Sequence, residues 1–123
     1  MLQFIKDLPV HVLGIHAIGD VTEDDFERTL IPLLTEKVDI YGEIYYLLIL
    51  ETNVDRFTFG AWWRDMVVGL KYFTKWKKIA IVTDQKAVRR FTNVFNYFIV
   101  GKSKSYPLNK IDEAVRWVSE KKV

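Results

Sequence analysis

The sequence predicts an α/β fold: a single mixed, mostly parallel five-stranded sheet with helices on both faces, in the order ββαβαβαβα. Three observations predict it. Short apolar segments alternate with amphipathic ones, residues 44–50 form an unbroken apolar run, and only a short turn separates the first two apolar segments. With 123 residues, half of them hydrophobic, the chain is expected to form one domain over residues 1–123.

The first third of the chain is expected to hold a strand hairpin and one helix. Residues 2–6 and 10–18 have the composition of strands, and Pro9 marks the turn between them. Thr22 and the three acids that follow it are typical of a helix N-terminus, and apolar residues at helical spacing come next. Pro32 predicts a kink in this helix.

Three further strands are expected. Residues 44–50 are apolar at every position, as a strand buried on both faces at the centre of a parallel sheet requires. Residues 78–82 are a second short apolar run, and residues 104–108 form a weaker third candidate.

Three further helices are expected between and after these strands. Residues 59–73 place their apolar side chains on one helical face. Thr83 and Asp84 are expected to cap the next helix, and Asn109 the last one, whose apolar residues recur every three or four positions over 111–118.

Composition excludes several classes of protein. The absence of cysteine excludes disulfides, thiolate metal sites and a cysteine nucleophile. No apolar run approaches the roughly 18 residues that a transmembrane helix needs, and no secretion signal is visible at the N-terminus. We therefore expect a cytoplasmic protein that can associate with the inner face of the membrane. The six glycines match no phosphate-binding loop, and we expect no cofactor.

Charge is distributed unevenly along the chain. Residues 1–61 hold 4 Lys/Arg and 11 Asp/Glu, a net charge of −7, whereas residues 62–123 hold 14 and 5, a net charge of +9. A basic half suits nucleic acid or anionic lipid. The alternative is that the exposed faces of the later helices are simply rich in lysine.

Few residues suit catalysis. His11 and His16 have opposite parity on one expected strand, so we expect them to face opposite sides of the sheet. Asp20, Glu51 and Asp84 follow strands and are candidates to hold Mg²⁺ together, although acids that precede helices are also expected as caps. No serine lies near a histidine in the sequence, and we expect no enzymatic activity.

Aromatic residues are dense near the middle of the chain, where seven of the 18 aromatics occupy 20 positions. Aromatic rings interleaved with cations are typical of a membrane interface, and the alternative is that these rings form ordinary core. The side chains expected to bind a ligand or membrane are Phe57, Phe59, Trp62, Trp63, Met66, Tyr72, Phe73, Trp76, Phe91, Phe95, Tyr97 and Phe98.

A basic surface is expected beside these aromatics. It comprises Lys71, Lys75, Lys77, Lys78, Arg89 and Arg90. Such a surface suits anionic lipid. Aromatic platforms for single-stranded nucleic acid normally lie on an open sheet, and this sheet is expected to be covered, so we expect no nucleic-acid partner.

Three segments carry a resemblance to a known family. Residues 62–71 (WWRDMVVGLK), 78–84 (KIAIVTD) and 111–118 (IDEAVRWV) resemble the SpoIIAA-like family, which has the STAS-like fold. The resemblance implies one compact domain without an established enzymatic activity. The chain also resembles CRAL-TRIO lipid-carrier domains, which enclose apolar ligands beneath helices.

One departure from the wider family bears on regulation. The resemblance to anti-sigma-factor antagonists implies a phosphorylatable serine at the start of the second helix, where this chain has Thr58 instead. A phosphothreonine at a helix N-terminus is electrostatically favourable, so Thr58 is the expected phosphorylation site.

Together these observations predict a non-enzymatic binding module. It is expected to hold a small apolar or amphipathic, lipid-like ligand between the second and third helices and to associate reversibly with anionic membranes. The alternative is a STAS-type regulatory module that binds a protein partner, as an anti-sigma-factor antagonist does, and is gated by phosphorylation at Thr58. The oligomeric state is left open.

Overall fold

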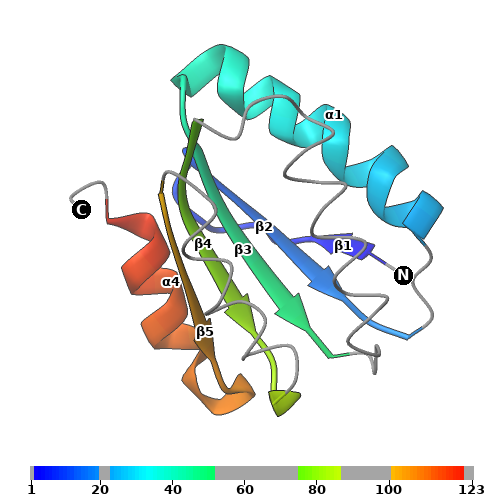
Figure 1. The fold of residues 1–123 in the computed structure, drawn as a ribbon, viewed down its shortest axis with the longest axis vertical. Helices are drawn as coiled ribbons and strands as arrows, with labels where there is room; N and C mark the ends of the chain where they lie inside the picture. The colour runs from blue at the N-terminus through cyan, green and yellow to red at the C-terminus, as the bar shows by residue number, and fades with distance from the viewer. Residues whose placement is uncertain (1, 20–22, 52–74, 87–100, 121–123) are drawn as a thin grey trace.

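The structure is a computed structural model that describes residues 2–19, 23–51, 75–86 and 101–120. Five strands in this part of the chain form one sheet in the order β1-β2-β3-β4-β5 (Figure 1). Strand β1 pairs antiparallel with β2, and the other neighbours pair in parallel. The strands are β1 Leu2–Phe4, β2 Val12–Ala17, β3 Ile44–Leu50, β4 Trp76–Val82 and β5 Lys102–Tyr106.

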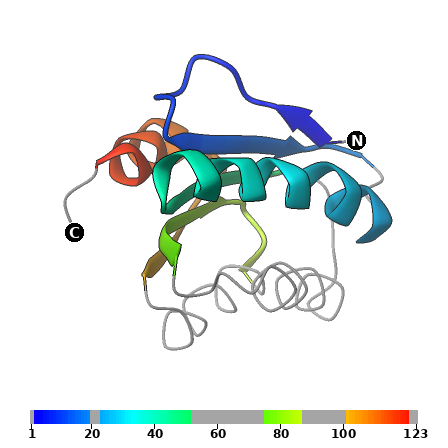
Figure 2. The ribbon, with the colours of Figure 1, turned by 90° about the horizontal axis from the view of Figure 1, so that it is seen from above.

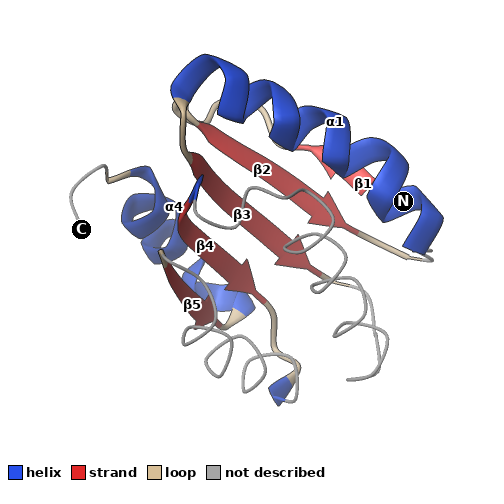
Figure 3. Ribbon diagram, turned by 45° about the horizontal axis from the view of Figure 1, so that its top comes forward, coloured by secondary structure: helices blue, strands red, loops and turns tan. Residues whose placement is uncertain are grey.

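The described helices pack against the two faces of this sheet. Helix α1 (Glu23–Tyr41) contacts β1, β2 and β3, and its long axis follows β2 in the view of Figure 2. Helix α4 (Ile111–Ser119) follows the short 3₁₀ helix η2 (Leu108–Lys110) and contacts β3, β4 and β5 (Figure 3). The predicted fold class, a mixed sheet with helices on both faces, is confirmed.

The core has two layers because β3 is buried at every position. Successive side chains of a strand point to opposite faces, so β3 supplies both layers. Tyr46 and Leu48 join the layer that α1 covers, together with Leu34 of that helix. Leu47 and Ile49 join the layer under α4, together with Ala114 and Val118.

A bulge in β4 changes the predicted position of Trp76. Ile44 pairs with Trp76 and Tyr45 pairs with Lys78, so Lys77 is an extra residue between them. An extra residue reverses the alternation on one side of a bulge. Trp76 therefore faces the same layer as Ile79 and is 1% exposed. Its predicted position on the surface is wrong, while contact with a ligand stays a prediction, and β4 begins two residues before the expected 78–82.

Three helix and strand boundaries also differ in detail from the sequence predictions. Helix α1 continues through Pro32 and ends before Gly42, whose positive φ of 75° suits the residue after a helix. Asn109 was expected to cap the last helix, but it lies inside η2, and α4 starts after Lys110 without a side-chain cap. Strand β5 ends at Tyr106 because Pro107, which has no N–H, begins the 3₁₀ turn.

Replacing Trp76 tests its buried position. We expect Trp76→Ala to lower the free energy of unfolding by about 3–5 kcal/mol, because it removes a fully buried indole and leaves a cavity. Lys75→Ala, at the exposed neighbouring position, should change it by only about 0.5 kcal/mol. Chemical denaturation followed by far-ultraviolet circular dichroism measures both. Small effects of equal size for both substitutions would show that Trp76 lies on the surface.

Candidate functional site

The carboxyl edge of the sheet, where β2, β3, β4 and β5 all end, is the candidate site. At one side of it, His16 near the end of β2 meets Glu51 directly after β3, and their Nε2 and Oε1 atoms are 2.9 Å apart. The Glu51 amide also donates to the carbonyl of Ala17 at 3.0 Å. The Glu51 side chain remains 44% exposed, so the pair is open to solvent and to a partner.

The other side of the carboxyl edge is held by hydrogen bonds between β4 and β5. The amide of buried Thr83 donates to the carbonyl of Tyr106 at 2.8 Å, and the Thr83 hydroxyl accepts from the amide of Gln85 at 3.2 Å. The exposed Asp84 carboxylate accepts from the amide of Leu108 at 3.0 Å. Asp84 therefore connects the exit of β4 to the start of η2.

The acids of this edge do not form a cation site in the described part of the chain. Glu51 pairs with His16, Asp84 accepts from a backbone amide, and Asp20 lies outside the described residues. Within the described ranges, no three metal-ligating side chains lie together. The pairing of His16 with Glu51 was not predicted from the sequence. The feature that could have indicated it is that both residues lie where neighbouring parallel strands end.

The two histidines lie at opposite ends of β2, but they do not face opposite sides of the sheet as predicted. His11 precedes the first residue of β2, so strand alternation does not govern it. Its ring packs edge-on against Tyr45, which belongs to the core layer under α4, and its Nε2 lies 2.8 Å from the carbonyl of Ser119. His11 thus contacts the last turn of α4.

Lys78 also lies at the last turn of α4. It is buried, so its prediction as a surface residue is wrong. It is 3% exposed, and its Nζ donates to the carbonyl of Trp117 at 2.8 Å. The Trp117 ring lies near two ammonium groups, with Lys78 Nζ 4.9 Å and Lys104 Nζ 5.1 Å from its centroid. Lys75 is exposed and Lys77 half-buried.

Burial and nearby lysines lower the pKa of Lys78 below its ordinary value of 10.5. Desolvation is the main cause; Glu120 acts in the opposite direction, and Lys104, Lys102 and Lys77 add to the lowering. A cation near the C-terminal carbonyls of a helix is favourable, so Lys78 stabilises the end of α4 at some cost in desolvation.

Two buried polar groups lie in the core layer on the other face. The Tyr46 hydroxyl and the Trp76 indole N–H have no hydrogen-bond partner among the described residues. The two rings meet edge-to-face with centroids 6.3 Å apart, and complete burial raises the pKa of Tyr46 above its usual range. Neither group reaches the surface, so this pair is part of the core.

The remaining predicted site residues lie outside the described part of the chain, and their roles stay predictions. They are Phe57, Thr58, Phe59, Trp62, Trp63, Met66, Lys71, Tyr72, Phe73, Arg89, Arg90, Phe91, Phe95, Tyr97 and Phe98.

No helix in the described ranges is both long and apolar enough to cross a membrane.

Comparison with known proteins decides the family. The family model for SpoIIAA-like proteins matches residues 12–119. The chain belongs to the SpoIIAA-like family. No curated protein matches the chain, and no comparison supports the resemblance to CRAL-TRIO domains.

A solved structure agrees with this SpoIIAA-like assignment. It is a DUF3478-family protein with a SpoIIAA-like fold from Shewanella loihica PV-4, 24% identical in sequence. The alignment covers 95% of this chain and 93% of that chain, with a TM-score of 0.62. At this identity the likeness shows the fold alone, which is the STAS-like arrangement that the sequence predicted.

Replacing Tyr46 tests whether its hydroxyl is unsatisfied. We expect Tyr46→Phe to raise the free energy of unfolding by about 1 kcal/mol, because an unpaired buried hydroxyl loses its hydrogen bonds to water on folding. Denaturant unfolding of both proteins measures the difference. A loss of about 1 kcal/mol instead would show that the hydroxyl has a partner.

The pKa of Lys78 predicts a pH dependence of stability. The folded chain has the lower pKa for this group, so between that pKa and 10.5 the unfolded chain binds more protons, and stability rises with pH. Lys78→Met removes the contribution of Lys78 to this pH dependence and leaves the contribution of the tyrosines in place. The free energy of unfolding of the wild type minus that of Lys78→Met should therefore increase as the pH approaches 10.5. A difference that falls with pH would show the opposite shift.

Proposed function

We propose that this SpoIIAA-like chain is a non-enzymatic regulatory module that binds a protein partner at the carboxyl edge of its sheet. Membership of the family and the STAS-like fold support this function. We choose this surface because polar side chains there join the ends of neighbouring strands, while Glu51 stays open to solvent.

The geometry of this edge suits recognition of a partner. The pair of His16 and Glu51 spans the ends of β2 and β3, and the hydrogen bond from Leu108 to Asp84 fixes the exit of β4. A surface whose side chains are already positioned loses little conformational entropy when a partner binds. Complementary charge at its rim then favours the correct partner over others.

Phosphorylation at Thr58 is proposed as the gate. Thr58 follows Glu51 by seven positions in the sequence, on the segment that leaves β3 at this edge. A phosphate adds close to two negative charges at neutral pH and attracts the cationic groups of a partner that is recognised through Glu51. Modification is therefore expected to strengthen binding at the carboxyl edge.

Lipid binding, the first expectation from the sequence, is not supported by the described residues. Trp76 is buried in the core, and Lys78 is bound to the end of α4. The family match gives no support for a lipid ligand either. Membrane association through the aromatic and basic residues outside the described ranges stays a prediction.

Affinity purification tests the proposed function. The tagged chain is recovered from the cells that produce it, and bound proteins are quantified by mass spectrometry. We expect Glu51→Lys to reduce recovery of a specific protein about tenfold, because charge reversal at a complementary interface is strongly unfavourable. Thr58→Glu adds negative charge and should raise recovery of the same protein, whereas Thr58→Ala, which cannot be phosphorylated, should lower it or leave it at the level of the unmodified chain.

A matched substitution controls for the added charge. Glu120→Lys makes the same change at an exposed position directly after α4 and should leave recovery unchanged. If no protein responds to Glu51→Lys, or if Glu120→Lys has the same effect, the carboxyl edge is not the binding surface.

A further inference from the structure

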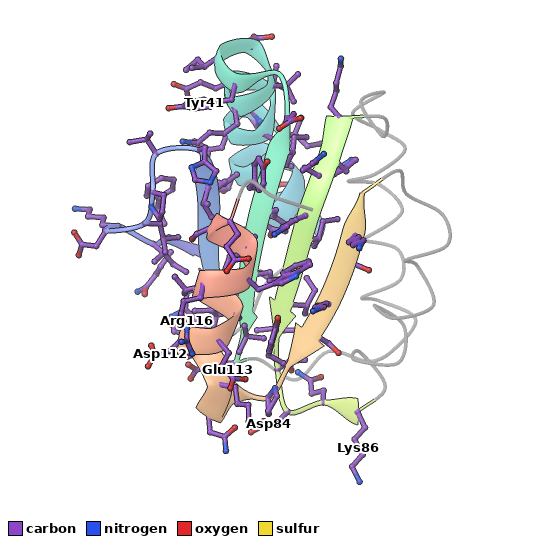
Figure 4. The ribbon with its side chains drawn as sticks, turned by 90° about the vertical axis from the view of Figure 1, so that its left-hand side faces the viewer. Tyr41, Asp84, Lys86, Asp112, Glu113 and Arg116 are labelled. Atoms are coloured by element: carbon purple, nitrogen blue, oxygen red, sulfur yellow. The ribbon has the colours of Figure 1, made fainter. Side chains whose placement is uncertain are left out.

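Three large apolar side chains are exposed together at the opposite end of the sheet. Val10 is 72% exposed in the turn that precedes β2, and Ile40 and Tyr41, at the end of α1, are 62% and 37% exposed. Both segments lie at the amino ends of parallel strands, since β2 begins at Val12 and β3 begins directly after α1. Figure 4 shows Tyr41 at one end of the molecule and Asp84 at the other.

A lysine joins these side chains into one surface. Lys37 Nζ donates to the backbone carbonyl of Val10 and lies 5.4 Å from the centre of the Tyr41 ring. Ile40 is three residues after Lys37 on the same helix, so the two are neighbours on the helix surface. We call Val10, Ile40 and Tyr41 the amino-edge patch. Exposed apolar groups that gather in this way mark interaction surfaces.

The charge next to the amino-edge patch is mostly negative on α1 and on the turn that joins it to β3. Helix α1 has no basic residue in its last turn, although a helix C-terminus carries partial negative charge and normally attracts cations. Glu36 lies four residues before Ile40 on the same face, and Asp39 and Glu43 are also exposed. Lys37 is the single cation among these four charged residues, and it is directed at Val10 and Tyr41.

From this combination we infer that the amino-edge patch docks a basic amphipathic segment of a partner protein, with apolar side chains on Ile40 and Tyr41 and Lys or Arg side chains on the acidic rim and the end of α1. Apolar contact supplies the affinity of such an interface, and complementary charge supplies its selectivity. An acidic or purely apolar segment fits this rim poorly. The surface is at the opposite end from the carboxyl edge, so the two proposals stand or fall separately.

A defined peptide tests this inference without knowledge of the natural partner. The probe is a short synthetic helix in which Leu recurs every third or fourth position and Lys fills the remaining ones, and a matched peptide replaces each Lys with Glu. Amide resonances of the isotope-labelled full chain are followed during titration. We expect the Leu/Lys peptide to shift the signals of Val10, Ile40 and Tyr41, and the Leu/Glu peptide to leave them unchanged.

Variants separate docking from non-specific attraction. Ile40→Ser should weaken the Leu/Lys peptide about tenfold, because it removes a large apolar contact. Glu36→Lys should weaken it as well, and more so at low salt, where charge is least screened. Phe4→Ser is the control: Phe4 is 51% exposed on β1, away from the patch, so its loss should leave the affinity unchanged.

Three results would overturn the inference. The first is a set of shifts confined to other residues, and the second is equal binding to wild type and Ile40→Ser. The third is a dimer of the free chain, seen by sedimentation, that Ile40→Ser dissociates. In that last case the patch would be the contact between two copies of this chain.

Discussion

Burial of β3 on both faces is the constraint on which the rest of this structure depends. A strand with seven apolar residues in succession has no face that is stable in contact with water. It therefore needs a neighbouring strand on each side and a packed element over each face. Strands β2 and β4 supply the neighbours, and α1 and α4 supply covers in the described part of the chain. The parallel pairing that results brings the ends of four strands to one edge, and that edge is the only reason why residues as distant in sequence as His16 and Asp84 can belong to one surface.

The sequence predicted this architecture well because hydrophobic periodicity reports burial directly. The uninterrupted run of β3 and the helical stripe of α4 each follow from which side chains avoid water. Its failures have local causes. Trp76 was placed on the surface by extending the helical pattern of residues 59–73, whereas it is the first residue of β4, where a bulge that only strand pairing reveals turns its side chain into the core. Lys78 was placed there because composition does not show that a helix end will accept its ammonium group.

The candidate site was predicted only in part, and the reason is again physical. Strand order indicated that Glu51 and Asp84 would share one edge, but not which groups would bond to them. That choice depends on distances of a few ångström between segments that are remote in sequence, such as the amide of Leu108 and the carboxylate of Asp84. The amino-edge patch was missed because single exposed apolar residues in a sequence look like core residues until the fold shows them side by side.

The hydrogen bond between His11 and Ser119 has a consequence for how the chain folds. It joins residues 108 positions apart, so it forms only after nearly the whole chain has closed on itself. Contacts of such long range slow folding, because the entropy of closing the loop is lost before the contact is gained. Helix α4 is short, and two of its last carbonyls, those of Trp117 and Ser119, are bonded by Lys78 of β4 and by His11. We therefore expect α4 to dock late in folding, when it joins the start of the chain to its end.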